Sequence, residues 1–149
     1  LILKHLPGHL NLILKLHPNT LKESSEMLAK HLKEARCKPN IVCVDQVPTI
    51  WPLLEQSHLF LGDMSSIGYD YLYFNRPIFF LPHPDCKLSE NSPLTKCGLT
   101  LAPSLLPEFF NNVEEYIKQA LPLAKESTSL YNEVFSPSHL NFLKKEALL

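Results

Sequence analysis

The amino-acid sequence predicts an α/β fold in which a parallel sheet carries helices on both faces, a Rossmann-like arrangement. Short apolar runs of strand length alternate with longer segments whose apolar residues recur at helical spacing. Prolines are frequent and fall between these segments, whereas glycines are scarce. Alternation of strands and helices favours parallel strands joined by helical crossovers. The 149 residues are enough for a single domain with its own core.

The first half of the chain contains two predicted strands, each followed by a helix. Leu1 to Leu6 resembles the tail of a helix, and the apolar run from Leu10 to Leu16 is typical of a strand. Leucine and methionine recur on one side of the segment from Thr20 to Arg36, which indicates an amphipathic helix. A second strand is expected over Ile41 to Val44, and a short helix over Val47 to Gln56.

The second half continues the alternation. Apolar runs predict strands over Leu59 to Leu61 and Ile78 to Leu81, with a short edge strand over Leu99 to Leu101. The segment from Pro82 to Gly98 has the composition of a loop. The predicted helices run from Ser65-Ser66 to Asn75-Arg76-Pro77, from Leu105 to Gln119, from Pro122 towards Tyr131, and from Ser138 to Leu148.

Composition excludes several classes of protein. The net charge of −1 gives no basic face for a nucleic acid, and no run of eighteen apolar residues is present to span a membrane. No signal peptide is recognisable, and Leu1 is expected to be an internal residue of a longer protein, so 1–149 would be one domain of a larger chain.

The cysteines and histidines do not form a metal-binding pattern. Four cysteines lack a CxxC pair, and the seven histidines show no ligand spacing with them, so we expect no metal and no cofactor. We expect reduced thiols in a cytoplasmic protein, although Cys86 and Cys97 flank one loop and can pair.

The segment between the third and fourth strands is a candidate anion site. Ser65 and Ser66 stand where a helix begins, and a serine hydroxyl there can accept a bond from a free N–H group. A helix N-terminus attracts phosphate groups. His17 follows the first strand, and ligands of open parallel sheets bind outside the carboxyl ends of the strands. The sequence therefore predicts that His17, Asp63, Ser65 and Ser66 converge at one edge.

Two motifs resemble those of the CDP-glycerol glycerophosphotransferases, enzymes that polymerise teichoic acids. Residues 62–70 (GDMSSIGYD), followed by residues 75–80 (NRPIFF), are similar to the nucleotide-binding segment of that family. Residues 14–18 (LKLHP) are similar to its Lys-x-His-Pro motif, and the elements between the motifs match in number and order. The resemblance covers Asn11 to Leu81 and implies the C-terminal half of a GT-B fold.

The resemblance implies a role for each candidate residue. Ser65 and Ser66 would bind the pyrophosphate of a nucleotide-activated donor, CDP-glycerol or a nucleotide-sugar, and Asp70 would accept bonds from ribose hydroxyls. His17 would neutralise charge on the leaving nucleotide or transfer a proton. Asp63 would order the turn. Structural explanations also remain open, because His17 can simply end a strand and Asp70 can be a solvated helix residue.

The chain departs from the family pattern in three places. Met64 replaces the usual aromatic residue, the loop after Leu81 differs, and the N-terminal acceptor half is absent. A nucleotide-sugar 2-epimerase or glycosyltransferase of the same fold, and a non-catalytic domain for binding or assembly, therefore remain alternatives. Family enzymes act at the cytoplasmic face of the membrane, so peripheral association of the parent protein is implied; no basic amphipathic helix supports it.

Overall fold

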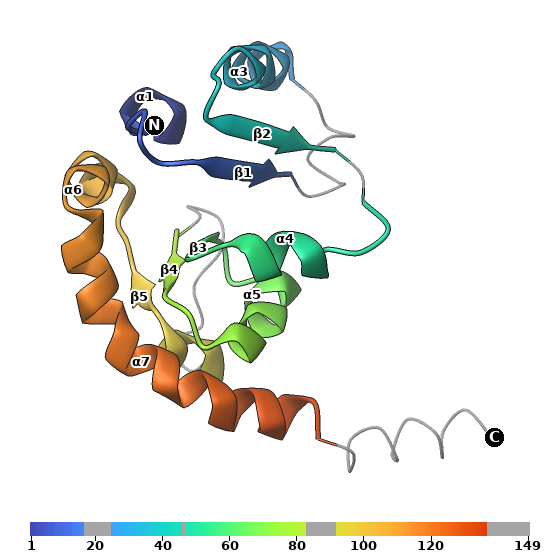
Figure 1. Cartoon of the computed structure of the whole chain (residues 1–149), viewed down its shortest axis with the longest axis vertical. Helices are drawn as coiled ribbons and strands as arrows, with labels where there is room; N and C mark the ends of the chain where they lie inside the picture. The colour runs from blue at the N-terminus through green and yellow to red at the C-terminus, as the bar shows by residue number, and fades with distance from the viewer. Residues whose placement is uncertain (17–24, 46, 83–91, 137–149) are drawn as a thin grey trace. The chain divides into compact units, whose positions relative to one another are not determined.

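The computed structural model describes residues 1–16, 25–45, 47–82 and 92–136. Parallel strands flanked by helices confirm the predicted α/β, Rossmann-like class (Figure 1). The chain groups into two compact units, of which unit 1 comprises Leu1–Ser57 with Leu106–Asn111, and unit 2 comprises His58–Leu105 with the residues from Asn112 onward. The strands, expected in one sheet, are hydrogen-bonded as a pair in unit 1 and a set of three in unit 2.

Unit 1 is built on two parallel strands. β1 (Leu12–Lys15) pairs with β2 (Ile41–Val44) in register along their whole length. Helix α3 (Glu26–Arg36) packs against β2, and Ser25 caps it by accepting a hydrogen bond from the Leu28 N–H at 3.2 Å. Within its described residues, the unit also has helices α1 (Ile2–His5), α4 (Trp51–Gln56) and α6 (Leu106–Asn111), of which α1 and α6 contact each other.

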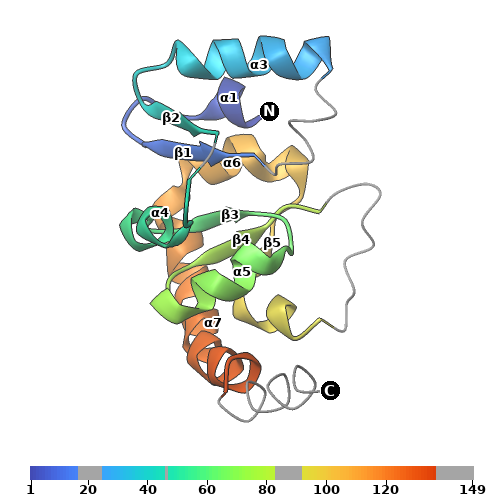
Figure 2. The ribbon, with the colours of Figure 1, turned by 90° about the vertical axis from the view of Figure 1, so that its right-hand side faces the viewer.

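Unit 2 is organised around a buried central strand. β4 (Ile78–Phe80) lies between β3 (Phe60–Gly62) and β5 (Leu99–Thr100), and all three of its side chains are fully buried. Helix α5 (Ser66–Tyr71) continues into the 3₁₀ turn η1 (Leu72–Phe74) and joins β3 to β4. Figure 2 shows α5 on one face of this sheet and α7 (Val113–Val134) on the other, which matches the predicted helices on both faces.

Three predictions of local structure need correction. The expected loop contains the 3₁₀ turn η2 (Pro93–Cys97), and a further 3₁₀ turn, η3 (Pro103–Leu105), precedes α6. The helix expected over residues 105–119 breaks at Asn112, and α7 then continues through Pro122 without interruption. The predicted helix over residues 138–148, the start of the one over residues 20–36, and Cys86 lie outside the described residues.

Packing explains why α7 tolerates an internal proline. Its buried residues are small except for one leucine, and they are spaced by three or four along one side: Ala120, Ala124, Ser127 and Leu130. This stripe lets α7 pack on η1, η2 and β4 at once. The burial offsets a proline cost of about 3 kcal/mol in a helix interior. Within the same region Cys97 is a free, buried thiol whose pKa is raised by burial.

Gly98 is required where η2 meets β5. A Cβ at this position would lie 2.6 Å from the Ile78 carbonyl oxygen and 2.8 Å from the Phe80 ring. Replacement by alanine therefore forces a backbone shift beside the buried strand. We expect Gly98→Ala to lower the free energy of unfolding by about 1–3 kcal/mol in urea denaturation. Gly8→Ala is the control, because nothing lies within 4 Å of its added Cβ; equal losses in both variants would contradict this account.

Pro122 is expected to destabilise the helix that contains it. It supplies no N–H group to the Lys118 carbonyl, so Pro122→Ala restores one helical hydrogen bond. We expect the free energy of unfolding to rise by about 1–3 kcal/mol, measured in urea. Pro52→Ala is the control, because Pro52 lies in the first turn of α4, where no helical donor is needed. A stability gain no larger than that of the control would show that α7 already compensates for the missing bond.

Candidate functional site

The candidate site begins where β3 ends. The Leu81 N–H donates to the Gly62 carbonyl at 2.8 Å, which holds the carboxyl ends of β3 and β4 side by side. Asp63 and Met64 then form an irregular turn, and α5 begins at Ser66. The N-terminus of α5 therefore lies at the carboxyl edge of the parallel strands, where open α/β sheets bind ligands.

Ser65 occupies the N-cap position of α5, as predicted, but its hydroxyl does not cap the helix. Its backbone is extended (φ −93°, ψ 177°), and its side chain accepts no bond from the first turn. The Gly68 N–H donates to the Ser65 carbonyl at 3.0 Å instead. The hydroxyl of Ser65 is consequently not used by the helix cap, whereas the Gly68 N–H is bonded to the Ser65 carbonyl.

Gly68 allows the first turn of α5 to approach η2 and β4 closely. Gly68 is buried, and a Cβ there would lie 3.0 Å from Leu94 Cδ2 in η2 and 3.8 Å from the Phe80 ring. The start of α5 is thereby packed against η2 and β4. The position of the two serines is set by this core contact as well as by the turn that precedes them.

The two candidate acids differ in their surroundings. Asp63 is exposed in the turn, whereas Asp70 is partly buried on α5, one turn beyond Ser66 and on the same side of the helix. Burial raises the pKa of the Asp70 carboxyl. A ligand that donates hydrogen bonds to this carboxylate would stabilise its charged form.

Arg76, which belongs to the motif over residues 75–80, contacts two aromatic residues. Its guanidinium lies 5.4 Å from the centre of the Phe74 ring, and it interacts with the hydroxyl of Tyr71. Tyr71 is fully buried, and burial raises its pKa to about 12 although Arg76 acts in the opposite direction. These contacts tie the end of η1 to the start of β4.

Four of the five predicted site residues are neighbours in sequence, and their role as a binding site stays a prediction. Asp63, Ser65, Ser66 and Asp70 lie on the β3–α5 segment of unit 2. His17 lies outside the described residues, after β1 of unit 1, so its predicted convergence with the serines stays a prediction. No group of three or more potential metal ligands occurs in the described ranges.

Sequence reasoning missed a groove along α7, which is lined by residues of that helix and by Asn75. Two lysines seven residues apart around Pro122 are a sequence signal for it, but Pro122 itself predicts a helix start or kink there. None of the helices in the described ranges combines the length and apolar character needed to cross a bilayer.

The raised pKa of Asp70 predicts how the free energy of unfolding depends on pH. The unfolded chain loses this proton at lower pH than the folded chain, so the folded state binds more protons in the window above 3.8. This carboxyl therefore makes the free energy of unfolding fall as pH rises through that window. We expect an NMR titration to place the Asp70 midpoint above 3.8, and Asp70→Asn to flatten this part of the stability curve. A midpoint at or below 3.8 would contradict the role of burial.

Comparison with known proteins identifies the family. The family model described as CDP-glycerol:poly(glycerophosphate) glycerophosphotransferase matches residues 1–92, which is more than half of the 149-residue chain and includes both motifs. Searches of curated proteins and of solved structures give no match. The chain belongs to the CDP-glycerol:poly(glycerophosphate) glycerophosphotransferase family.

Proposed function

We propose that this chain is the donor-binding part of a GT-B-type glycerophosphotransferase, and that the β3–α5 turn binds the pyrophosphate of CDP-glycerol. The observation that carries the proposal is the Ser65 hydroxyl, which lies at the N-cap position of α5 without capping the helix. The Ser65 hydroxyl makes no capping bond with the first turn of α5, so it can donate to a phosphate oxygen at this helix N-terminus. The family match over residues 1–92 supports the same donor.

The proposed reaction is transfer of glycerophosphate to a growing chain. A terminal hydroxyl of the acceptor attacks the phosphorus that bears glycerol, a new P–O bond forms, and the P–O bond to CMP breaks. Negative charge develops on the departing CMP. The N-terminus of α5 with Ser65 and Ser66 would stabilise that charge. A protonated His17 would add to this stabilisation or transfer a proton.

Asp70 would orient the nucleotide. An ionised Asp70 can accept bonds from both ribose hydroxyls, and such bonds favour the charged carboxylate. Binding of the donor should therefore lower the pKa of Asp70, against the effect of burial. Asp63, which is exposed, would order the turn rather than react.

We place the parent protein in teichoic acid synthesis at the cytoplasmic face of the membrane, where an N-terminal acceptor half would complete the enzyme. This chain alone is not expected to turn over substrate, because that half supplies the acceptor. Binding is therefore the activity to test. Nucleotide-sugars are the competing donors, and a domain that binds no nucleotide is the competing function.

Thermal-shift titration of the full chain with CDP-glycerol, CDP, UDP and UDP-GlcNAc tests the proposal. A ligand that binds only the folded state stabilises it, by about 2.7 kcal/mol at a hundredfold excess over Kd. We expect CDP-glycerol to raise the melting temperature and to shift the Asp70 titration downward. Stabilisation by UDP-GlcNAc alone would favour the nucleotide-sugar enzymes, and no stabilisation of a folded sample by any of the four would overturn nucleotide binding.

Replacing both Ser65 and Ser66 by alanine should weaken binding about tenfold or more, because each lost bond to a charged oxygen is worth about 1.5–3 kcal/mol. The native fold should persist, since the Ser65 hydroxyl makes no cap bond. Ser104→Ala, an exposed serine in η3, is the matched control. His17→Ala should also weaken binding. Unchanged affinity in both the serine and the histidine variants would show that the nucleotide binds elsewhere.

A further inference from the structure

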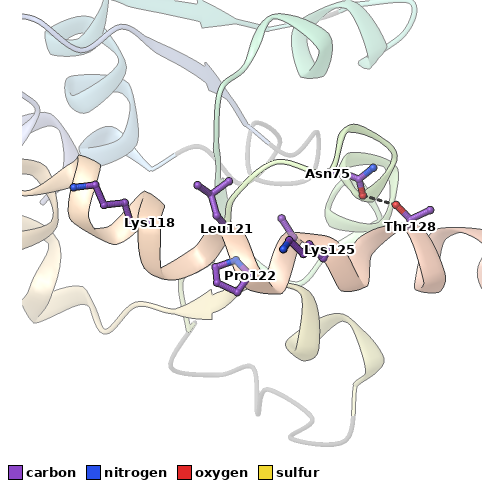
Figure 3. A pocket seen from close by; sticks show the side chains of 7 residues that line it. Asn75, Lys118, Leu121, Pro122, Lys125 and Thr128 are labelled. Carbon is purple, nitrogen blue, oxygen red and sulfur yellow. Dashed lines mark hydrogen bonds between the residues drawn. The ribbon is translucent and has the colours of Figure 1, made fainter.

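A groove runs along α7 in unit 2. It has a volume of about 690 Å³ and is lined by Asn75, Lys118, Leu121, Pro122, Ala124, Lys125 and Thr128 (Figure 3). The Thr128 hydroxyl donates to Asn75 Oδ1 at 2.7 Å and connects the helix to the turn before β4. Between Lys118 and Thr128 the helix rises about 15 Å, so the groove is elongated. We call this feature the α7 groove.

The α7 groove and the serine turn lie at opposite edges of the three-stranded sheet. Ser65 follows the carboxyl end of β3, whereas Asn75 ends η1 and precedes the amino end of β4. Since β3 and β4 are parallel, α5 and η1 carry the chain from one edge back to the other. A ligand in the α7 groove therefore occupies a site distinct from the proposed pyrophosphate site.

Two exposed lysines make the groove basic. Lys118 and Lys125 are seven residues apart on α7, which places their Cα atoms about 10 Å apart along the helix axis. Lys125 has no ion pair among the described residues, and Lys118 makes only a loose one with Glu115 at 3.8 Å between exposed groups. Such an exposed pair contributes little and can be exchanged for an anionic ligand. The spacing suits an elongated ligand with repeated negative charge better than one small anion.

An apolar surface separates the two lysines. Leu121, which is 47% exposed, lies beside Pro122 and Ala124, and no aromatic residue lines the groove. Lys118, Leu121 and Lys125 follow one another at spacings of three and four residues, so they share one side of α7. A ligand that matches this row carries an apolar group between two negative charges. Single-stranded nucleic acid fits less well, because it is bound through aromatic stacking as well as charge.

The spacing of the row matches a helix better than an extended peptide. In a helix, acids seven residues apart lie about 10 Å apart on one side, with an apolar residue between them at the third or fourth position. In an extended chain, side chains on one side recur about every 7 Å, so no two of them match a separation of about 10 Å. The groove therefore favours a helical occupant with acids at every seventh position.

The described part of this chain does not supply such a helix. Glu126 and Glu133 are the one pair of acids seven residues apart within a described helix, and the leucine between them, Leu130, is buried. A second copy of α7 would offer the charges without the exposed apolar side chain. The complementary helix is therefore expected in a different protein.

We propose that the α7 groove docks an acidic amphipathic helix of a partner protein. Two carboxylates of that helix pair with Lys118 and Lys125, and an apolar side chain between them packs on Leu121. The proposal does not depend on nucleotide binding, because the groove and the serine turn lie at opposite edges of the sheet.

Fluorescence anisotropy with a labelled model peptide and the full chain tests the proposal. The peptide repeats the heptad Glu-Ala-Gln-Leu-Ala-Gln-Ala over about 20 residues, a length sufficient for a helix. We expect saturable binding that weakens as NaCl is raised. A peptide with lysine in place of each glutamate should not bind. An isomer of the same composition, with its glutamates on different sides of the helix, should bind several-fold more weakly.

Reversing the charge of the groove tests the same pairing from the other side. Replacing both Lys118 and Lys125 by glutamate should weaken binding of the acidic peptide about tenfold or more and should create binding of the lysine peptide. The control replaces Lys30 and Lys33, exposed lysines of α3 in unit 1, by glutamate and changes the net charge equally. Leu121→Gln keeps the charge of the groove and should weaken binding about three- to tenfold, because apolar contact is lost.

Four outcomes would overturn the proposal or its occupant. Absence of saturable binding, or equal losses in the groove and control variants, would overturn docking at α7. Equal binding of the isomer would overturn the helical occupant, and equal or tighter binding of polyphosphate would overturn a peptide. A dimer of the chain alone that the groove variant abolishes would assign the surface to a second copy. The groove variant should keep its stabilisation by CDP-glycerol, so failure of the donor site and failure of the groove are separately visible.

Discussion

The complete burial of β4 is the constraint on which unit 2 depends. Ile78, Phe79 and Phe80 have no exposed surface, because β3 and β5 bond to both edges of the strand and helices cover both faces. A strand buried on both faces is apolar throughout, which is why three consecutive large apolar residues occur here. Small residues elsewhere follow from the same constraint: Gly98 fits against the Ile78 carbonyl, and alanines of α7 fit against η2.

This constraint places the functional candidates. A parallel connection from β3 to β4 must return to the amino edge of the sheet, and α5 with η1 makes this return in nine residues. One end of the connection presents Ser65 and Ser66, and the other presents Asn75 in a left-handed conformation (φ 49°), which asparagine adopts more readily than most residues. The proposed donor site therefore lies at one end of this connection, and Asn75, which accepts a hydrogen bond from Thr128 of α7, lies at the other.

In the candidate site, a hydroxyl that does not cap its helix belongs to a tightly packed turn. The Ser65 hydroxyl is not committed to capping, while Gly68 packs the same turn against Leu94. At the opposite end the contacts of Arg76 with Phe74 and Tyr71 fix the entry into β4. Binding groups held by packed neighbours lose little entropy when a ligand arrives, so such an arrangement suits recognition of a charged group.

The sequence by itself determined the class of fold, the order of strands and helices, and the family motifs. Apolar runs at strand length located β2 and β4 within a residue, and for β4 burial on both faces explains the uninterrupted apolar pattern. Tertiary structure decided the rest. It carried α7 through Pro122, where packing outweighs a local penalty, and it divided the strands into two hydrogen-bonded sets. It also left the Ser65 hydroxyl unused and raised the pKa of Asp70, since capping geometry and burial depend on neighbours distant in sequence.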